Sequence, residues 1–188
     1  MASPFLYFAD DRLSLAELTA ARLDGDVVEL GEAYIPADAV ETRALRAGSL
    51  AGILGDTLAG THLTAAWIHG ALPAPPARHT VQRAVARRLH RIPMRHLVYR
   101  DLAVDPVDLE IIGGVRVTSP VRTLADLARV PDDAHVRAAR LLAEGRSTLV
   151  ADAVSRLEQG ALPHKRVAIE FLRGLSEPAG ADQDDVTR

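Results

Sequence analysis

Nine of the ten arginines and histidines between residues 78 and 100 form the group whose chemistry is easiest to name. A guanidinium binds phosphate well because its planar fork of N–H donors matches two phosphate oxygens. A surface with that many phosphate contacts would bind nucleic acid in a strongly salt-dependent way. The same side chains could instead dock an acidic protein surface, or be solvated on an arginine-rich hairpin in a GC-rich proteome. The nine are Arg78, His79, Arg83, Arg87, Arg88, Arg91, Arg95, His96 and Arg100.

The distribution of charge says more about partners than the net charge of −3 does. Residues 1–62 carry ten acidic side chains and four arginines, whereas residues 63–100 carry seven arginines and no acidic side chain. Residues 101–188 are acidic again, with fifteen acidic and eleven basic side chains. A second copy of the chain is therefore one candidate partner, because its acidic N-terminal segment could meet the basic segment in a homodimer.

Arg122 and Asp126 are a second pair that could do chemistry, since they lie four residues apart on an expected helix. Directly after a strand, such a pair can be a catalytic carboxylate with its activating cation. Far more often it is an ion pair on the helix face, or a buried contact that fixes the helix against its sheet. We therefore expect a structural role for this pair.

Several enzyme classes need groups that the sequence lacks. A nuclease of the restriction-enzyme kind needs a lysine soon after its acidic metal ligands, but the only lysine, Lys165, lies 55 residues after Glu110. A nucleotidyltransferase needs two closely spaced acids after Gly-Ser, and Gly48-Ser49 is followed by Asp56 alone. There is no cysteine, no histidine pair at i and i+4, no Gly-Lys-Ser/Thr phosphate loop and no Gly-x-Ser-x-Gly motif. We expect a protein that is not an enzyme, with no catalytic site, metal or cofactor.

The elements that must position these groups are clearest between Val115 and Arg129. Alternating apolar and polar residues at 115–118 predict a short strand, paired across a two-glycine turn with residues 109–112. Ser119 stands where a helix N-cap belongs, and Pro120 at the first helical position, where its missing N–H costs nothing. Apolar residues then recur at helical spacing to residue 129.

Trp67 is the only tryptophan, and it lies in an expected helix that begins at Thr61 or Thr64. Trp67 and His69 could shape a pocket at the end of this helix. The more ordinary interpretation is that Trp67 anchors the core, His69 caps the last turn, and Gly70 is the residue that ends the helix.

The predicted fold class is α+β. Further helices are expected over residues 14–23, 40–58, 132–142, 149–159 and 164–175, and further strands over 26–30, 32–35, 79–85 and 97–100. A helix followed by a hairpin is typical of the last part of a winged helix, but too few residues precede it for a complete one. We expect a winged-helix-like, incomplete N-terminal domain at 1–58, and an α/β domain with a small sheet and a C-terminal helical bundle at 59–175. An acidic tail at 176–188 is expected to be disordered.

We expect a cytoplasmic protein. No apolar run is long enough to cross a membrane, and the N-terminus lacks the leading positive charge of a signal peptide. The lack of cysteine fits a reducing compartment.

Three segments, in order, resemble the AbiEi-type antitoxins of type IV toxin–antitoxin systems and their actinobacterial relatives. Residues 62–70, H-L-T-A-A-W-I-H-G, are similar to a helix of the form s-h-x-s-A-A-x-l-h-G-l, and the basic segment ending at 96–100 is similar to the strand pair that follows it. Residues 114–129, G-V-R-V-T-S-P-V-R-T-L-A-D-L-A-R, resemble the most recognisable motif, g-x-p-V-T-s-p-x-R-T-l-x-D-l-a-R. The motif residues here are Trp67, Gly70, Ser119, Pro120, Arg122, Thr123 and Asp126.

The resemblance implies a bacterial antitoxin and transcriptional regulator. In that family a winged helix binds promoter DNA, and the C-terminal domain counteracts a nucleotidyltransferase-like toxin. Some relatives carry a Vsr-like nuclease after this module, and we expect none here because few residues follow it. We thus expect protein–protein contact with such a toxin, and DNA binding at the protein's own promoter.

One departure from the family pattern concerns the expected winged helix, which is acidic where the family is usually basic. Acidic side chains there would repel phosphate, so we expect the arginines of residues 83–100 to contribute more to any DNA binding. The alternatives are a homo-oligomeric interaction module, a DNA-binding regulator without a toxin partner, or an unrecognised enzyme. The acidic residues concerned are Glu17, Asp24, Asp26, Glu29 and Glu32, opposed by Arg12 and Arg22.

Overall fold

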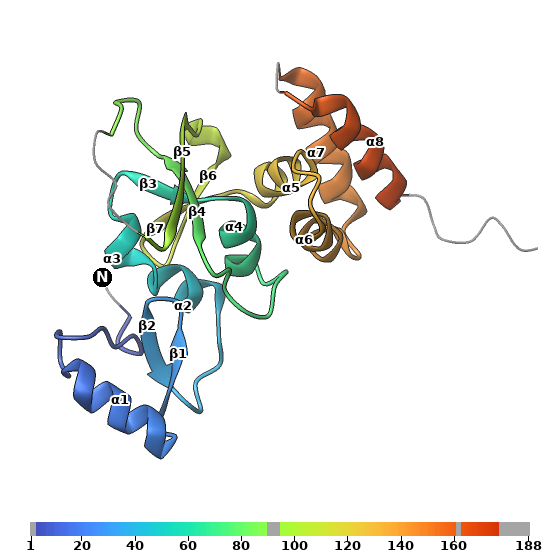
Figure 1. The fold of residues 1–188 in the computed structure, drawn as a ribbon. Helices are drawn as coiled ribbons and strands as arrows, with labels where there is room; N and C mark the ends of the chain where they lie inside the picture. Colours follow the sequence, from blue (N-terminus) through green and yellow to red (C-terminus); the bar gives the residue numbers. More distant parts are fainter. Residues whose placement is uncertain (1–2, 90–94, 161–162, 177–188) are drawn as a thin grey trace, which may run out of the picture.

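A five-stranded mixed sheet, a two-stranded sheet and a set of helices make up the computed structural model, which describes residues 3–89, 95–160 and 163–176 (Figure 1). The predicted α+β fold class is confirmed. The strands are β1 (Val27–Leu30), β2 (Ala33–Pro36), β3 (Leu58–Gly60), β4 (His79–Arg83), β5 (Leu97–Ala103), β6 (Leu109–Ile112) and β7 (Val115–Thr118). The helices are α1 (Leu15–Asp24), α2 (Arg43–Gly48), α3 (Ala51–Leu54), α4 (His62–Ile68), α5 (Pro120–Ala128), α6 (Asp133–Ala143), α7 (Ser147–Gln159) and α8 (Lys165–Ser176), with a 3-10 turn η1 at Pro106–Asp108.

The N-terminal part consists of α1 and the antiparallel hairpin β1–β2, as the sequence predicted. Ser14 and Glu17 form a capping box in which Ser14 Oγ accepts the Glu17 N–H at 3.3 Å and the Glu17 carboxylate accepts the Ser14 N–H at 2.8 Å. Gly25 ends the helix with a φ of +84°. Among its own residues α1 buries only Leu18. The winged-helix interpretation of residues 1–58 stays a prediction.

Residues 40–58 do not form the single long helix that their apolar spacing predicted. Two short helices, α2 and α3, form instead, and Ser49 and Leu50 separate them. Gly55 then ends α3 with a φ of +51°, before the chain enters β3. Three glycines in this stretch lower its helix propensity. The chain then takes up the extended conformation that allows β3 to pair with two neighbouring strands.

Strands β4 and β5 are parallel, whereas the sequence predicted an arginine-rich hairpin. His79 pairs with Leu97, and Gln82 pairs with Arg100. A tight turn can join only antiparallel strands, so a parallel pair needs a longer connection, for which the chain has the residues between Arg83 and Leu97. The alternation of side chains in a strand is the same for either direction, which is why the sequence pattern could not decide between them.

The strand order of the larger sheet is β5-β4-β3-β7-β6. The predicted hairpin of β6 and β7 is confirmed, with Ile112 opposite Val115, and so are the predicted helices at α5 to α8. Because β3 and β7 are parallel neighbours, the helices that follow them, α4 and α5, begin at the same end of the sheet. No helix in the described part of the chain is long and apolar enough to cross a membrane.

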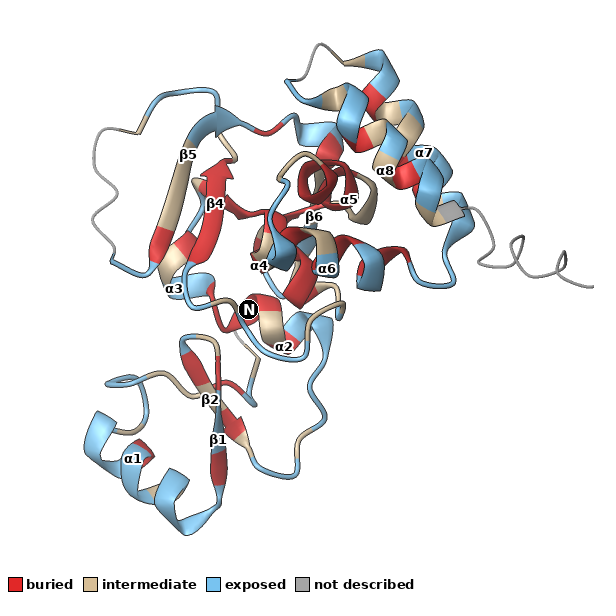
Figure 2. Ribbon diagram, turned by 45° about the vertical axis from the view of Figure 1, so that its right-hand side comes forward, coloured by how far each residue is buried: buried red, intermediate tan, exposed pale blue. Residues whose placement is uncertain are grey.

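Two apolar cores lie on the two sides of α4 (Figure 2). One lies between the sheet and α2 to α4 and contains the fully buried Trp67, together with Leu30 and Ile35 of the small sheet. The other fills the bundle of α5 to α8, and Ala66 reaches it from α4. The proposed domain boundary at residue 58 remains a prediction, although the first core contains residues from both sides of it.

Gly113 lies where the turn between β6 and β7 meets α2. Its φ is +57°, and a Cβ atom built on it would lie 2.2 Å from the backbone oxygen of Ala44. Gly114, the next residue, has a φ of +86° and open space around its Cα. Alanine at either position would have an unfavourable backbone conformation, but only alanine at Gly113 would also clash with α2.

We expect Gly113→Ala to lower the free energy of unfolding more than Gly114→Ala. Both variants place alanine in the left-handed region, which costs about 1–2 kcal/mol. Only Gly113→Ala must also displace α2, which adds about 1–3 kcal/mol. Chemical denaturation of the two variants and the wild type measures the difference. Equal losses would show that α2 moves aside without cost.

Candidate interaction surface and the ionic network behind it

The motif that joins β7 to α5 is a helix cap with an additional threonine contact. Ser119 Oγ accepts the Arg122 N–H at 3.3 Å, and Pro120 occupies the first helical position. Thr123 Oγ1 donates to the Thr118 carbonyl at 3.0 Å. The structure therefore places these motif residues in positions that fix the start of α5.

A cluster of five charged side chains, three of them buried and two half-buried, ties α5 to η1 and α7, and we call it the ionic network. Arg122 donates from Nε to Asp126 at 2.8 Å and from Nη1 to Asp108 at 2.7 Å. Arg156 on α7 donates twice to Asp108, at 2.7 and 3.1 Å, and Arg129 donates to Asp126 at 3.1 Å. Because Asp126 is 1% exposed and Asp108 is 5% exposed, the two carboxylates depend on these partners for their solvation.

The electrostatics of the ionic network favour the charged forms of Asp108 and Arg122. Burial alone would raise the pKa of Asp108, but Arg156 and Arg122 lower it below its usual value. Burial raises the pKa of Asp126, while Arg122 and Arg129 stabilise its carboxylate. Burial would lower the pKa of Arg122, but its two aspartate partners raise it. Every member is engaged by another, so the arrangement supports a bracing role for Arg122 and Asp126 rather than acid–base chemistry.

Sequence reasoning missed most of this network. It considered Arg122 and Asp126 only as a pair on one helix, and gave no role to Arg156, which lies far along the chain from Asp108. No local spacing could have connected these two residues. Among the residues with described coordinates, no group of three or more histidines, aspartates and glutamates is arranged to hold a metal ion.

The end of α4 is fixed by contacts of its last residues. Trp67 is fully buried, and Gly70 has a φ of +88° with its N–H donated to the Trp67 carbonyl at 3.0 Å. His69 Nε2 donates to the Thr118 carbonyl at 2.7 Å, so its Nδ1 accepts the Arg43 Nη2 donor at 2.8 Å. Burial lowers the pKa of His69, in keeping with this neutral form. The structure thus places Trp67 and Gly70 in the core and at the helix end.

Five of the predicted binding arginines lie around β4 and β5, and we call them the arginine surface. Four are exposed and one is half-buried. Among the residues that the structure describes, only Arg88 of this set lies within 4.0 Å of a carboxylate, at 3.8 Å from Asp101. The set therefore carries positive charge that is largely unneutralised within the described chain. The members are Arg78, Arg87, Arg88, Arg95 and Arg100.

The structure does not bring all predicted binding residues to this surface. Arg83 is buried, donates to the carbonyls of Val85, Ala86 and Arg87 at 2.6 to 3.2 Å, and pairs with Asp101 at 2.8 Å. His79 is buried beside α4, and burial, with a smaller effect from His96, lowers its pKa to about 4. Arg91 lies outside the described residues. Arg83 therefore braces the connection after β4 instead of facing a partner.

The acidic side chains of the N-terminal part face solvent. All ten acidic residues before residue 62 are exposed, and Arg22 pairs with Glu29 between α1 and β1. The exposed face of the N-terminal part is therefore acidic, in contrast to the arginine surface.

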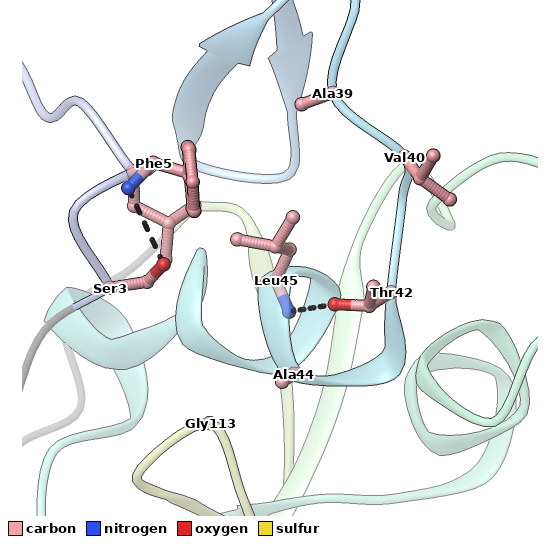
Figure 3. A pocket seen from close by; sticks show the side chains of 9 residues that line it. Ser3, Phe5, Ala39, Val40, Thr42, Ala44, Leu45 and Gly113 are labelled. Carbon is pink, nitrogen blue, oxygen red and sulfur yellow. Dashed lines mark hydrogen bonds between the residues drawn. The ribbon is translucent and has the colours of Figure 1, made fainter.

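An apolar pocket of about 510 Å³ lies between the N-terminal segment and α2 (Figure 3). Phe5 and Val40 stand on opposite sides of it, and they are 54% and 79% exposed. Its two hydroxyls are already engaged, because Ser3 Oγ accepts the Phe5 N–H at 3.4 Å and Thr42 Oγ1 accepts the Leu45 N–H at 3.2 Å. The pocket has no titratable group and contains none of the predicted binding residues.

We expect Arg122→Met to lower the free energy of unfolding by about 3 kcal/mol, since removing one partner of a buried ion pair typically costs 3–5 kcal/mol. Asp108 and Asp126 would each keep one arginine, which places the expected loss near the lower end. Arg140→Met, which changes an exposed arginine on α6, is the control and should cost less than about 0.5 kcal/mol. Urea denaturation measures both, and similar values would contradict a bracing role.

Comparison with known proteins gives one family match and one structural match of note. No curated protein matches the chain. A crystal structure of the RV2827C protein from Mycobacterium tuberculosis is similar at 17% identity, covering 83% of this chain and 69% of that one, with a TM-score of 0.36. The model of the AbiEi antitoxin C-terminal domain matches residues 58–162. That match spans the sheet from β3 onward, the arginine surface and the ionic network, and it covers more than half of the chain. The protein therefore belongs to the AbiEi antitoxin family.

Proposed function

We propose that this protein is an antitoxin that neutralises a nucleotidyltransferase-like toxin by direct contact, and that the arginine surface makes the contact. The observation that carries the proposal is the location of this surface within the matched domain. Membership of the family supports an antitoxin or regulatory role in a toxin–antitoxin system. The identity of the toxin and the contact surface are our inference.

Charge and rigidity both favour the arginine surface as the contact. Arg100 extends from β5, and Arg78 and Arg95 lie just before β4 and β5. The other two members extend from the connection after β4, where Arg83 donates to three backbone carbonyls. A surface that is held in this way loses little conformational freedom on binding. A protein partner with an acidic patch would meet it with complementary charge, which raises the rate of association and selects against other partners.

The first test is co-expression with a nucleotidyltransferase-like protein encoded beside this chain. The wild type should restore growth and co-purify with the toxin, whereas the double variant R87E/R88E should lose both because the charge of the contact is reversed. The control is R137E/R140E, which makes the same change in charge at exposed positions on α6. Equal loss in both double variants would point to net charge and not to this surface.

We further propose that the same surface binds DNA at the protein's own promoter. The exposed acidic side chains of α1 and its hairpin would repel phosphate, whereas exposed arginines can each neutralise one. The alternative is a homodimer in which the acidic N-terminal part of one copy binds the arginine surface of the other. No enzymatic activity is proposed.

A gel shift with the upstream DNA over a salt series tests the DNA proposal. Affinity should fall as salt rises, and R87A/R88A should reduce the slope of log K against log salt by about 2, since each phosphate that is no longer neutralised reduces it by about 0.9. R137A/R140A is the control. Tight binding that R87A/R88A leaves unchanged would contradict the proposal. Light scattering of the protein alone reports the alternative, because a charge-driven dimer would dissociate at high salt.

A further inference from the structure

Strand β5 forms one edge of the five-stranded sheet, and in the described chain no second strand pairs with its outer side. The opposite edge strand, β6, contacts α2. Arg43 of α2 pairs with Glu110 on β6 at 3.1 Å, and the turn after β6 packs against α2 through Gly113. The two edges therefore differ in their contacts with α2, which packs against β6 and makes no comparable contact with β5 in the described chain.

Hydrogen bonding shows which backbone groups of β5 point outward. The His79 N–H donates to the His96 carbonyl at 2.7 Å, so the backbone groups of His96 point toward β4. In a parallel ladder every second residue does the same, and the residues between them direct their N–H and C=O groups to the other side. The Leu97 carbonyl therefore points away from β4, and it accepts the Arg78 Nη2 donor at 2.8 Å. Tyr99, two residues on, therefore presents its N–H and C=O on the outer side.

The C-terminal half of β5 is exposed, and within the described residues no further strand pairs with it. Leu97 is buried, but Asp101, Leu102 and Ala103 are exposed, and Leu102 is 60% exposed (Figure 2). Natural edge strands are commonly blocked by proline or lysine, or covered by a helix or loop. β5 contains neither proline nor lysine.

The arginines around this edge favour a partner segment that is acidic. Arg78 precedes β4, Arg95 precedes β5, and Arg100 lies on β5 itself. Asp101, the only acidic residue of β5, is already engaged by Arg83 at 2.8 Å. Pairing of β5 with the β5 of a second copy would bring two sets of these arginines together, which like-charge repulsion disfavours.

We propose that the outer edge of β5 binds an extended, acidic segment of a partner protein by strand addition. Backbone hydrogen bonds to the ladder give affinity, and carboxylates of the added strand pair with the arginine surface. The proposal rests on the proposed function in that it names the chemistry of the partner at that surface. Nucleic acid could use the arginines, but it could not continue the backbone ladder.

Synthetic peptides test the edge without any toxin, so the result is independent of whether the toxin proposal holds. The probe is a short fluorescent peptide of alternating glutamate and valine, chosen for charge and strand propensity. Fluorescence anisotropy with the full chain should show binding. The same peptide N-methylated at consecutive residues should bind at least about tenfold more weakly, because neither edge of the strand can then donate its backbone N–H groups, and a lysine–valine peptide should not bind.

A variant locates the site. R100E should weaken binding of the acidic peptide by about tenfold or more, whereas R140E on α6 should leave it unchanged, with circular dichroism confirming that both variants fold. Equal binding of the N-methylated peptide would overturn the proposal, because charge alone would then explain the contact. Absence of peptide binding would overturn it as well. If a DNA duplex bound instead and R100E weakened that binding, the surface would be assigned to nucleic acid.

Discussion

The carboxylate of Asp108 is the point on which the arrangement of sheet and bundle depends. It lies in η1, directly before β6, and accepts from Arg122 on α5 and from Arg156 on α7. Its backbone carbonyl also accepts the Ser119 N–H at 2.8 Å, beside the cap of α5. One residue thus sets where α5 starts and how the bundle is oriented. A network of this kind contributes geometric specificity more than net stability, since burying the charges costs much of what the pairing returns.

The position of α4 follows from this constraint. Because α5 is held at the end of the sheet, α4 lies between sheet and bundle and contributes to both cores, Trp67 to one and Ala66 to the other. Strand β5 lies on the side of the sheet away from α7 and α8 (Figure 2). The ionic network and the arginine surface therefore divide the matched domain into a part that holds the fold and a part that is open to partners.

Local signals in the sequence predicted the elements well, and non-local pairings could not be predicted. The cap at Ser119 and the two-glycine turn are encoded in adjacent residues, and each was found where it was expected. The parallel pairing of β4 with β5 depends on where residues 84–96 run, which alternation does not encode. The same limit applies to the site. The cluster of arginines was visible as composition, but only the fold shows that Arg83 is buried while Arg87 and Arg88 are exposed.

The place of β3 in the sheet has a consequence for how the chain is made. β3 lies between β4, which follows it closely, and β7, which is synthesised much later. As the chain leaves the ribosome, one side of this central strand has no neighbour until residues 115–118 emerge. The Thr118 carbonyl that fixes His69 arrives only then as well. An incomplete chain thus exposes an unpaired strand and a loosely held α4, which are features that chaperones and proteases act on. The pairing of β7 with β3 therefore completes the sheet and closes this exposed edge.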